Sequence, residues 1–192
     1  MLNYSVFIAA CDGGGAVKTL EEQMSFYAAY HQDARNKATH FFGVPMIIVS
    51  LLVPLSWPQV DLGPLHITAA IAFAAVVLLY YVFLDAVLAM GSAVFMALFL
   101  LLAEWLARQG VAAGWTAFAV LFVGGWIVQL LGHAFEGRKP ALADNLFQIF
   151  IAPIFLCAEL FFALGYKPKL HAAVQARARE MRAAADAKLT TA

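Results

Sequence analysis

Two polar segments interrupt an otherwise apolar chain, and both carry histidine. The first, residues 30–40, holds His31 and His40, and the second, residues 129–140, holds His133 with Glu136 three residues later. Neutral imidazoles are the commonest metal ligands in proteins, and three of them beside a carboxylate suit Fe, Zn, Cu or Ni better than Mg or Ca. If the fold joins the two segments, the sequence predicts a shared metal site.

The spacing within the first segment sets a condition on the backbone. On one unbroken helix, His31 and His40 would point in opposite directions and lie about 13.5 Å apart along the axis. Asn36 is a good N-cap residue, so we expect one helix to end near His31 and the next to begin after Asn36. That bend would turn both imidazoles inward. His133 and Glu136 already share a helix face.

Helices that cross a lipid bilayer are the elements expected to position these side chains. Of the 192 residues, 64% are hydrophobic and 12% charged, and the mean hydropathy is +0.81, whereas soluble domains are near half apolar and a quarter charged. The prediction is an all-α integral membrane protein, a bundle of four to five transmembrane helices preceded by an N-terminal interfacial helix. The interfacial helix is expected at residues 18–31, and the apolar runs occupy residues 39–57, 66–84, 86–106, 115–131 and 146–164.

We expect one helical membrane domain at residues 24–168, between a flexible N-terminal extension at residues 1–23 and a basic C-terminal tail at residues 169–192. Twelve basic and twelve acidic side chains cancel, which argues against a nucleic-acid partner. If the fifth apolar run is re-entrant, dipping into the bilayer and returning with a break at Pro153, every Lys and Arg except Arg108 lies on one side. We favour this arrangement, which makes that side cytoplasmic.

Several other polar residues are expected near the metal or the substrate. An even number of crossings places Asp85 on the same side as the histidines, and Glu159 is a carboxylate inside an apolar run that needs a partner. His66 begins a span at the opposite side and His171 lies in the tail, so neither is expected to bind the metal. The candidates for outer contacts to the metal or substrate are Tyr30, Asn36, Asp85, Glu136, Arg138 and Glu159.

Two blocks of residues carry a resemblance to a known family by their order and spacing. The first is Tyr30-His31 … Asn36 … His40 … Gly43 … Pro45. The second is Trp126 … Gln129 … Gly132-His133 … Glu136 … Pro140-Ala141-Leu142 … Asn145-Leu146 … Ala152-Pro153 … Phe155 … Glu159. Together they resemble the family of small membrane proteins typified by the yeast 2-hydroxy fatty acid dioxygenase. The likeness runs from Met24 to about Pro168, and the middle spans match only as apolar helices.

The resemblance implies an oxidoreductase of fatty acid metabolism with an Fe(II) cofactor. Its reaction would be the α-oxidation of a long-chain 2-hydroxy fatty acid to the acid one carbon shorter, with O₂ and without 2-oxoglutarate. His31, His40 and His133 fall on the family's histidine motifs and would be the metal ligands and catalytic residues. A bacterial inner membrane with the active site on its cytoplasmic face is the expected location.

Two alternatives remain open on the residues alone. A zinc-dependent membrane lipid hydrolase could use the same ligands, because imidazole suits zinc as well as iron. A non-enzymatic membrane scaffold or small transporter could instead use the histidines only to order helix ends. Metal analysis and O₂ consumption separate these readings.

Overall fold

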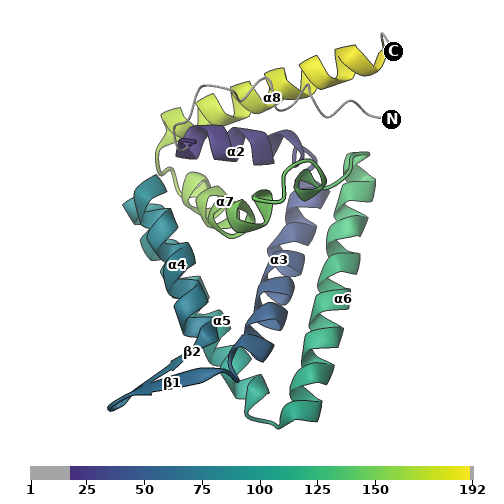
Figure 1. Ribbon diagram of the computed structural model, residues 1–192. Helices are drawn as coiled ribbons and strands as arrows, with labels where there is room; N and C mark the ends of the chain where they lie inside the picture. The colour runs from purple at the N-terminus through teal and green to yellow at the C-terminus, as the bar shows by residue number, and fades with distance from the viewer. Residues whose placement is uncertain (1–17, 191–192) are drawn as a thin grey trace.

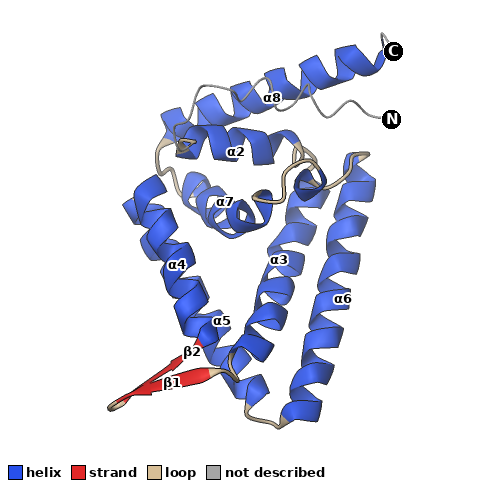
Figure 2. Cartoon of the chain, in the orientation of Figure 1, coloured by secondary structure: helices blue, strands red, loops and turns tan. Residues whose placement is uncertain are grey.

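The computed structural model describes residues 18–190 and is almost wholly helical there (Figures 1 and 2). The expected flexible extension at residues 1–23 lies mostly outside the described residues, although its last four residues already belong to the first helix. The helices are α2 (Leu20–Ala29), α3 (Ala34–Leu55), α4 (Ala69–Leu84), α5 (Ala86–Ala107), α6 (Val111–Glu136), α7 (Gln148–Ala163) and α8 (Pro168–Thr190), with a short 3-10 helix, η1 (Ala141–Ala143). One antiparallel hairpin joins β1 (Gln59–Leu62) to β2 (Leu65–Thr68).

Three of these helices are long and apolar enough to cross a bilayer. They are α3 and α5, with 22 residues each, and α6, with 26. At 1.5 Å per residue these lengths are about 33 to 39 Å, against a hydrocarbon layer of about 30 Å. The apolar helices α4 and α7 have 16 residues each, or about 24 Å. The predominantly helical fold, with helices apolar enough to cross a membrane, is confirmed, whereas the expected count of four to five spans is not.

Helix α7 starts and finishes at the same end of the bundle. Near its start, Gln148 donates a hydrogen bond to Gln23 of α2, and just after its end Lys167 forms an ion pair with Asp85 at the α4–α5 turn. Figure 1 shows α2 and α8 side by side at this end and the hairpin at the other. The chain therefore enters and leaves α7 at one end of the bundle, but α7 continues as a helix through Pro153 and the expected break is absent.

The hairpin is an element that the sequence reading did not anticipate. The second apolar run was expected to begin at His66, but residues 65–68 form β2 and α4 begins only at Ala69, with the Thr68 side chain as its N-cap. Gly63 has φ +63° in the turn, a conformation that glycine adopts at little cost. Gly-Pro between two short β-branched segments is a turn signal, which the surrounding apolar residues obscured.

Glycines allow α3 and α6 to pack closely over most of their length. A Cβ atom on Gly43 would lie 2.6 Å from Cγ of Gln129, and one on Gly125 would lie 2.8 Å from Cγ1 of Ile47. A Cβ on Gly132 would lie 2.0 Å from Oγ1 of Thr39. Small residues at such contacts are how membrane helices approach one another. This contact brings the start of α3 against the end of α6, where the two polar segments lie.

Replacing Gly132 by Ala is expected to separate the ends of α3 and α6. The new methyl group would strike Thr39, whose hydroxyl donates to the backbone oxygen of Asn36, and would lie 2.6 Å from Oδ1 of the buried Asn36. Overpacking of this kind costs about 1–3 kcal/mol, so thermal unfolding in detergent should begin at a lower temperature.

Gly124→Ala is the matched control on the same helix. Its Cβ would meet only the flexible end of Met46, at 3.0 Å, and alanine favours the helix over glycine by about 1 kcal/mol. Equal unfolding temperatures for the two variants would show that α3 and α6 are not in close contact at Gly132.

Candidate metal centre

A backbone break between α2 and α3 shapes the first polar segment. Helix α2 ends at Ala29, and α3 begins at Ala34 with Asp33 as its N-cap, whose carboxylate accepts a hydrogen bond from the backbone of Arg35 at 2.8 Å. The helix break expected between His31 and His40 is therefore present, but the prediction that Asn36 is the N-cap is wrong. Asn36 lies inside the first turn of α3 and is fully buried, because the chain turns three residues earlier at Asp33.

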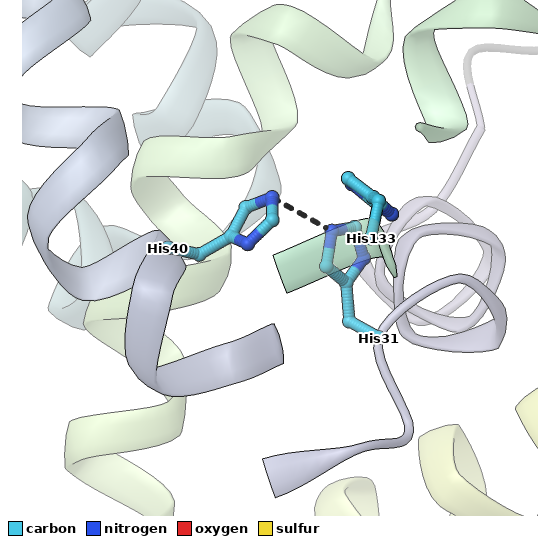
Figure 3. Close-up of side chains that lie close together, drawn as sticks. All are labelled: His31, His40 and His133. Atoms are coloured by element: carbon cyan, nitrogen blue, oxygen red, sulfur yellow. Dashed lines mark hydrogen bonds between the residues drawn. The ribbon is translucent and has the colours of Figure 1, made fainter. Parts of the chain in front are cut away.

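The break brings the rings of His31 and His40 together in a T-shaped arrangement, and α6 adds His133 (Figure 3). One ligand nitrogen from each ring lies within 4.8 Å of the others. The Nε2 atoms of His31 and His40 are 3.1 Å apart, and the His133 ring centroid is 5.0 Å from each of the other two. All three side chains are buried. The convergence expected from the sequence is therefore present in the fold.

Backbone carbonyls decide which nitrogen of each ring is available. Nδ1 of His31 lies 2.7 Å from the oxygen of Tyr27, and Nδ1 of His40 lies 2.9 Å from the oxygen of Asn36. A carbonyl only accepts, so each Nδ1 carries hydrogen and each Nε2 keeps a lone pair. Two lone pairs directed at each other across 3.1 Å repel unless a cation lies between them.

The environment keeps this cluster neutral in the absence of a cation. Burial, and then the nearby His40, hold the pKa of His31 well below its ordinary value. Nδ1 of His133 is buried without a hydrogen-bond partner, and an unpaired buried nitrogen is costly. Neutral imidazoles with free lone pairs and an orphaned ring nitrogen fit a metal ion, and three nitrogen donors suit a transition metal.

Glu136 and Asn36 support the three rings. The Glu136 carboxylate accepts hydrogen bonds from the backbone of Gln32 at 3.2 Å and of Asp33 at 2.8 Å, and from Nδ2 of Asn36 at 3.1 Å. Asn36 also donates to the backbone oxygen of Tyr30. These contacts fix the backbone after His31 and the position of Asn36, whose backbone oxygen accepts a hydrogen bond from Nδ1 of His40. Both residues lie where the sequence placed them, beside the histidines.

The other four residues that were expected to contact the metal or the substrate have partners outside the histidine cluster. The Tyr30 hydroxyl donates to Asp144 at 2.6 Å, and Arg138 pairs with Asp186. Glu159 pairs with Lys37 at 2.9 Å, and its other oxygen is buried without a partner. Asp85 caps α5 and pairs with Lys167. None of these contacts reaches a histidine of the cluster.

The two remaining described histidines are remote from the cluster. His66 is exposed on β2 and lies 2.6 Å from Asp61, and His171 stacks on Phe162 with ring centroids 4.7 Å apart. Neither belongs to the group of described residues that could share a metal.

An apolar cavity of about 180 Å³ opens onto the histidine cluster. On α3 its wall follows one helix face from His40 through Val44, Ile47 and Ile48 to Leu51, a distance of about 17 Å along the axis. Other helices add further wall residues, among them Tyr27 of α2, Tyr81 of α4, Met96 of α5, Trp126 and Gln129 of α6, and Gln148 of α7. The three imidazoles thus form a polar patch on a long apolar chamber.

Sequence reasoning overlooked three contributors. The Tyr27 ring stacks on His31 with centroids 4.0 Å apart and supplies the carbonyl described above; its position one helical turn before His31 was the available signal. Gln148 lines the cavity and is 1% exposed, yet its Oε1 has no partner. Arg182, from the expected tail, pairs with Glu136, and nothing in its local sequence indicates this.

Comparisons with known proteins identify the family of this chain. A family profile described as "2-hydroxy-palmitic acid dioxygenase Mpo1-like" matches residues 17–164. The 2-hydroxy-palmitic acid dioxygenase MPO1 of Saccharomyces cerevisiae is 32% identical over 164 residues, which cover 84% of this chain and 91% of the yeast protein. No solved structure matches. The matched region includes all three histidines and both motif blocks, and the chain belongs to the Mpo1-like family of 2-hydroxy-palmitic acid dioxygenases.

Proposed function

We propose that this protein is an Fe(II)-dependent dioxygenase that shortens long-chain 2-hydroxy fatty acids by one carbon. The observation that carries the proposal is the convergence of His31, His40 and His133 at an apolar cavity. The name of the yeast relative supplies the substrate class. Iron, rather than another transition metal, is part of the proposal, since imidazole ligands alone admit several metals.

His31, His40 and His133 would hold the ion through ring nitrogens, and the carbonyls of Tyr27 and Asn36 would fix the orientation of the first two rings. Bound iron would supply a centre for activating O₂ and orienting the substrate. All three rings are buried at a mostly apolar cavity, which would limit the access of water and favour a selective oxidation over side reactions.

The cavity suits an elongated ligand with one polar end. The acyl chain would lie along the α3 face between His40 and Leu51, and the carboxylate and 2-hydroxyl would lie at the histidines. The nearby basic side chains are not placed to pair with the substrate carboxylate. Arg35, Lys37, Arg138 and Lys139 each have an acidic partner, and none of them lines the cavity.

The reaction balances without a further reductant. Conversion of R–CH(OH)–COOH to R–COOH and CO₂ releases four electrons, and reduction of O₂ to water accepts four. The sum is R–CH(OH)–COOH + O₂ → R–COOH + CO₂ + H₂O. This balance agrees with the expected independence of 2-oxoglutarate.

The charge distribution supports a cytoplasmic site. Helix α8 packs on α2, so its basic residues join Lys18 before α2 and the basic residues at the start of α3 at the histidine end, whereas Arg108 follows α5 at the other end. Lys and Arg accumulate on the cytoplasmic side of membrane proteins. We propose a bacterial inner membrane with the histidine cluster at its cytoplasmic face.

Purified protein supplied with Fe(II) should bind iron and convert 2-hydroxypalmitic acid to the acid one carbon shorter, with O₂ consumed. His133→Ala removes a proposed ligand, so its loss of activity should exceed the roughly 10- to 100-fold cost of losing an outer contact. Product mass spectrometry and elemental analysis provide the measurement. His66→Ala, an exposed and remote change, should behave as the wild type.

Two other results would favour a different function for this protein. Zinc without O₂ consumption would favour a lipid hydrolase. Metal near zero in both the wild type and His133→Ala would favour a scaffold or transporter.

A bulky side chain at the far end of the cavity should shorten the preferred substrate. In Leu51→Trp the indole would occupy space that the end of a long chain needs, and turnover of 2-hydroxypalmitic acid should fall by roughly tenfold relative to 2-hydroxydecanoic acid. Val76→Trp, which adds an indole at a position 68% exposed on α4, is the control. An unchanged chain-length profile in Leu51→Trp would place the acyl chain elsewhere.

A further inference from the structure

One stripe of α8 faces the rest of the protein beside the metal centre. It consists of Val174, Ala178, Arg182 and Asp186, spaced four residues apart and so aligned on one helix face. Val174 and Ala178 are buried, Arg182 pairs with Glu136, and Asp186 pairs with Arg138. The stripe changes from apolar to charged where it reaches the end of α6.

Two further contacts hold α8 against the segment that carries His31. Arg177 lies 4.0 Å from Glu21 and 3.7 Å from Glu22 of α2. Gln32, the residue after His31, donates to Gln175 at 3.4 Å. The expected basic tail is therefore a packed helix, and its inward face lies over the α2–α3 break.

Arg182 compensates a charge that the site cannot leave unpaired. The Glu136 side chain is 0% exposed, and the Arg182 guanidinium is its ion-pair partner among the described residues. Its other hydrogen bonds come from neutral donors, two backbone amides and Asn36. A buried carboxylate without a cation is strongly destabilised and would take up a proton or move toward water.

Glu136 in turn touches the surroundings of all three histidines. It follows His133 by three residues on α6, and the backbone amides of Gln32 and Asp33 that it holds follow His31 directly. Asn36, its third donor, supplies the carbonyl that accepts Nδ1 of His40. Displacing this carboxylate would therefore disturb the His31 and His40 rings, each through one intervening residue.

We infer that Arg182 is a positioning residue of the metal centre, acting through Glu136. Helix α8 therefore contributes to the metal centre by supplying Arg182. This inference rests on the proposed function for the presence of a metal ion at the three histidines. The arrangement of Glu136, the two backbone amides and Arg182 does not depend on which ion the histidines hold.

The test compares Arg182→Gln, Arg182→Lys and Arg179→Gln in the full-length protein. Arg179 is exposed on the same helix and serves as the matched control. Co²⁺ binding to metal-free protein, followed by visible absorption, reports the histidine cluster. Hydrogen exchange of the peptide covering residues 30–36 reports the amides held by Glu136, with no metal present.

Arg182→Gln should bind Co²⁺ several-fold more weakly, below the roughly 10- to 100-fold cost of losing a residue that contacts a ligand directly, with faster exchange in residues 30–36 and unchanged exchange in α5. Arg182→Lys, which keeps the charge, should recover most of both losses, and Arg179→Gln should match the wild type.

Wild-type affinity and exchange in Arg182→Gln would overturn the inference. Faster exchange spread equally through α3, α5 and α6 would also overturn it, because it would show a role in global stability alone. If no variant, including the wild type, binds Co²⁺, the proposed metal function fails, and the exchange of residues 30–36 still decides the role of Arg182.

Discussion

The close contact between α3 and α6 is the constraint on which the rest of the site depends. His40 comes from one of these helices and His133 from the other, and glycines at the contact leave no space between the backbones. Lipid offers little hydrophobic drive for two apolar helices to associate, so close packing must supply the attraction. The contact therefore sets both the stability of the helix pair and the separation of two rings. The break before α3 then needs only to bring His31 to the same point.

The buried, neutral rings set a second requirement, namely that uncharged groups hold each ring in its orientation. Backbone carbonyls perform this for His31 and His40, because each accepts the Nδ1 hydrogen and leaves Nε2 free. Glu136 holds the connecting backbone and Arg182 balances its charge. The charged groups thus surround the cluster without entering it. This arrangement leaves the free ring lone pairs available to bind a cation.

Part of this structure could be predicted from the sequence, and the division has physical reasons. The long apolar runs predicted membrane helices, and the nine-residue spacing of His31 and His40 required a break between them, which the structure contains. The meeting with His133 followed from counting crossings. The hairpin at residues 59–68 was missed because its apolar side chains resemble the start of a span. The pairing of Arg182 was unpredictable because it joins residues 46 positions apart through tertiary packing alone.

X-ray absorption spectroscopy of the iron-loaded protein in detergent tests the central claim most directly. Scattering from imidazole carbons identifies histidine ligands independently of activity. The account predicts iron bound by three imidazoles in the wild type and by fewer when His31, His40 or His133 is replaced one at a time. An iron spectrum with no imidazole scattering, or one unchanged by all three replacements, would contradict it.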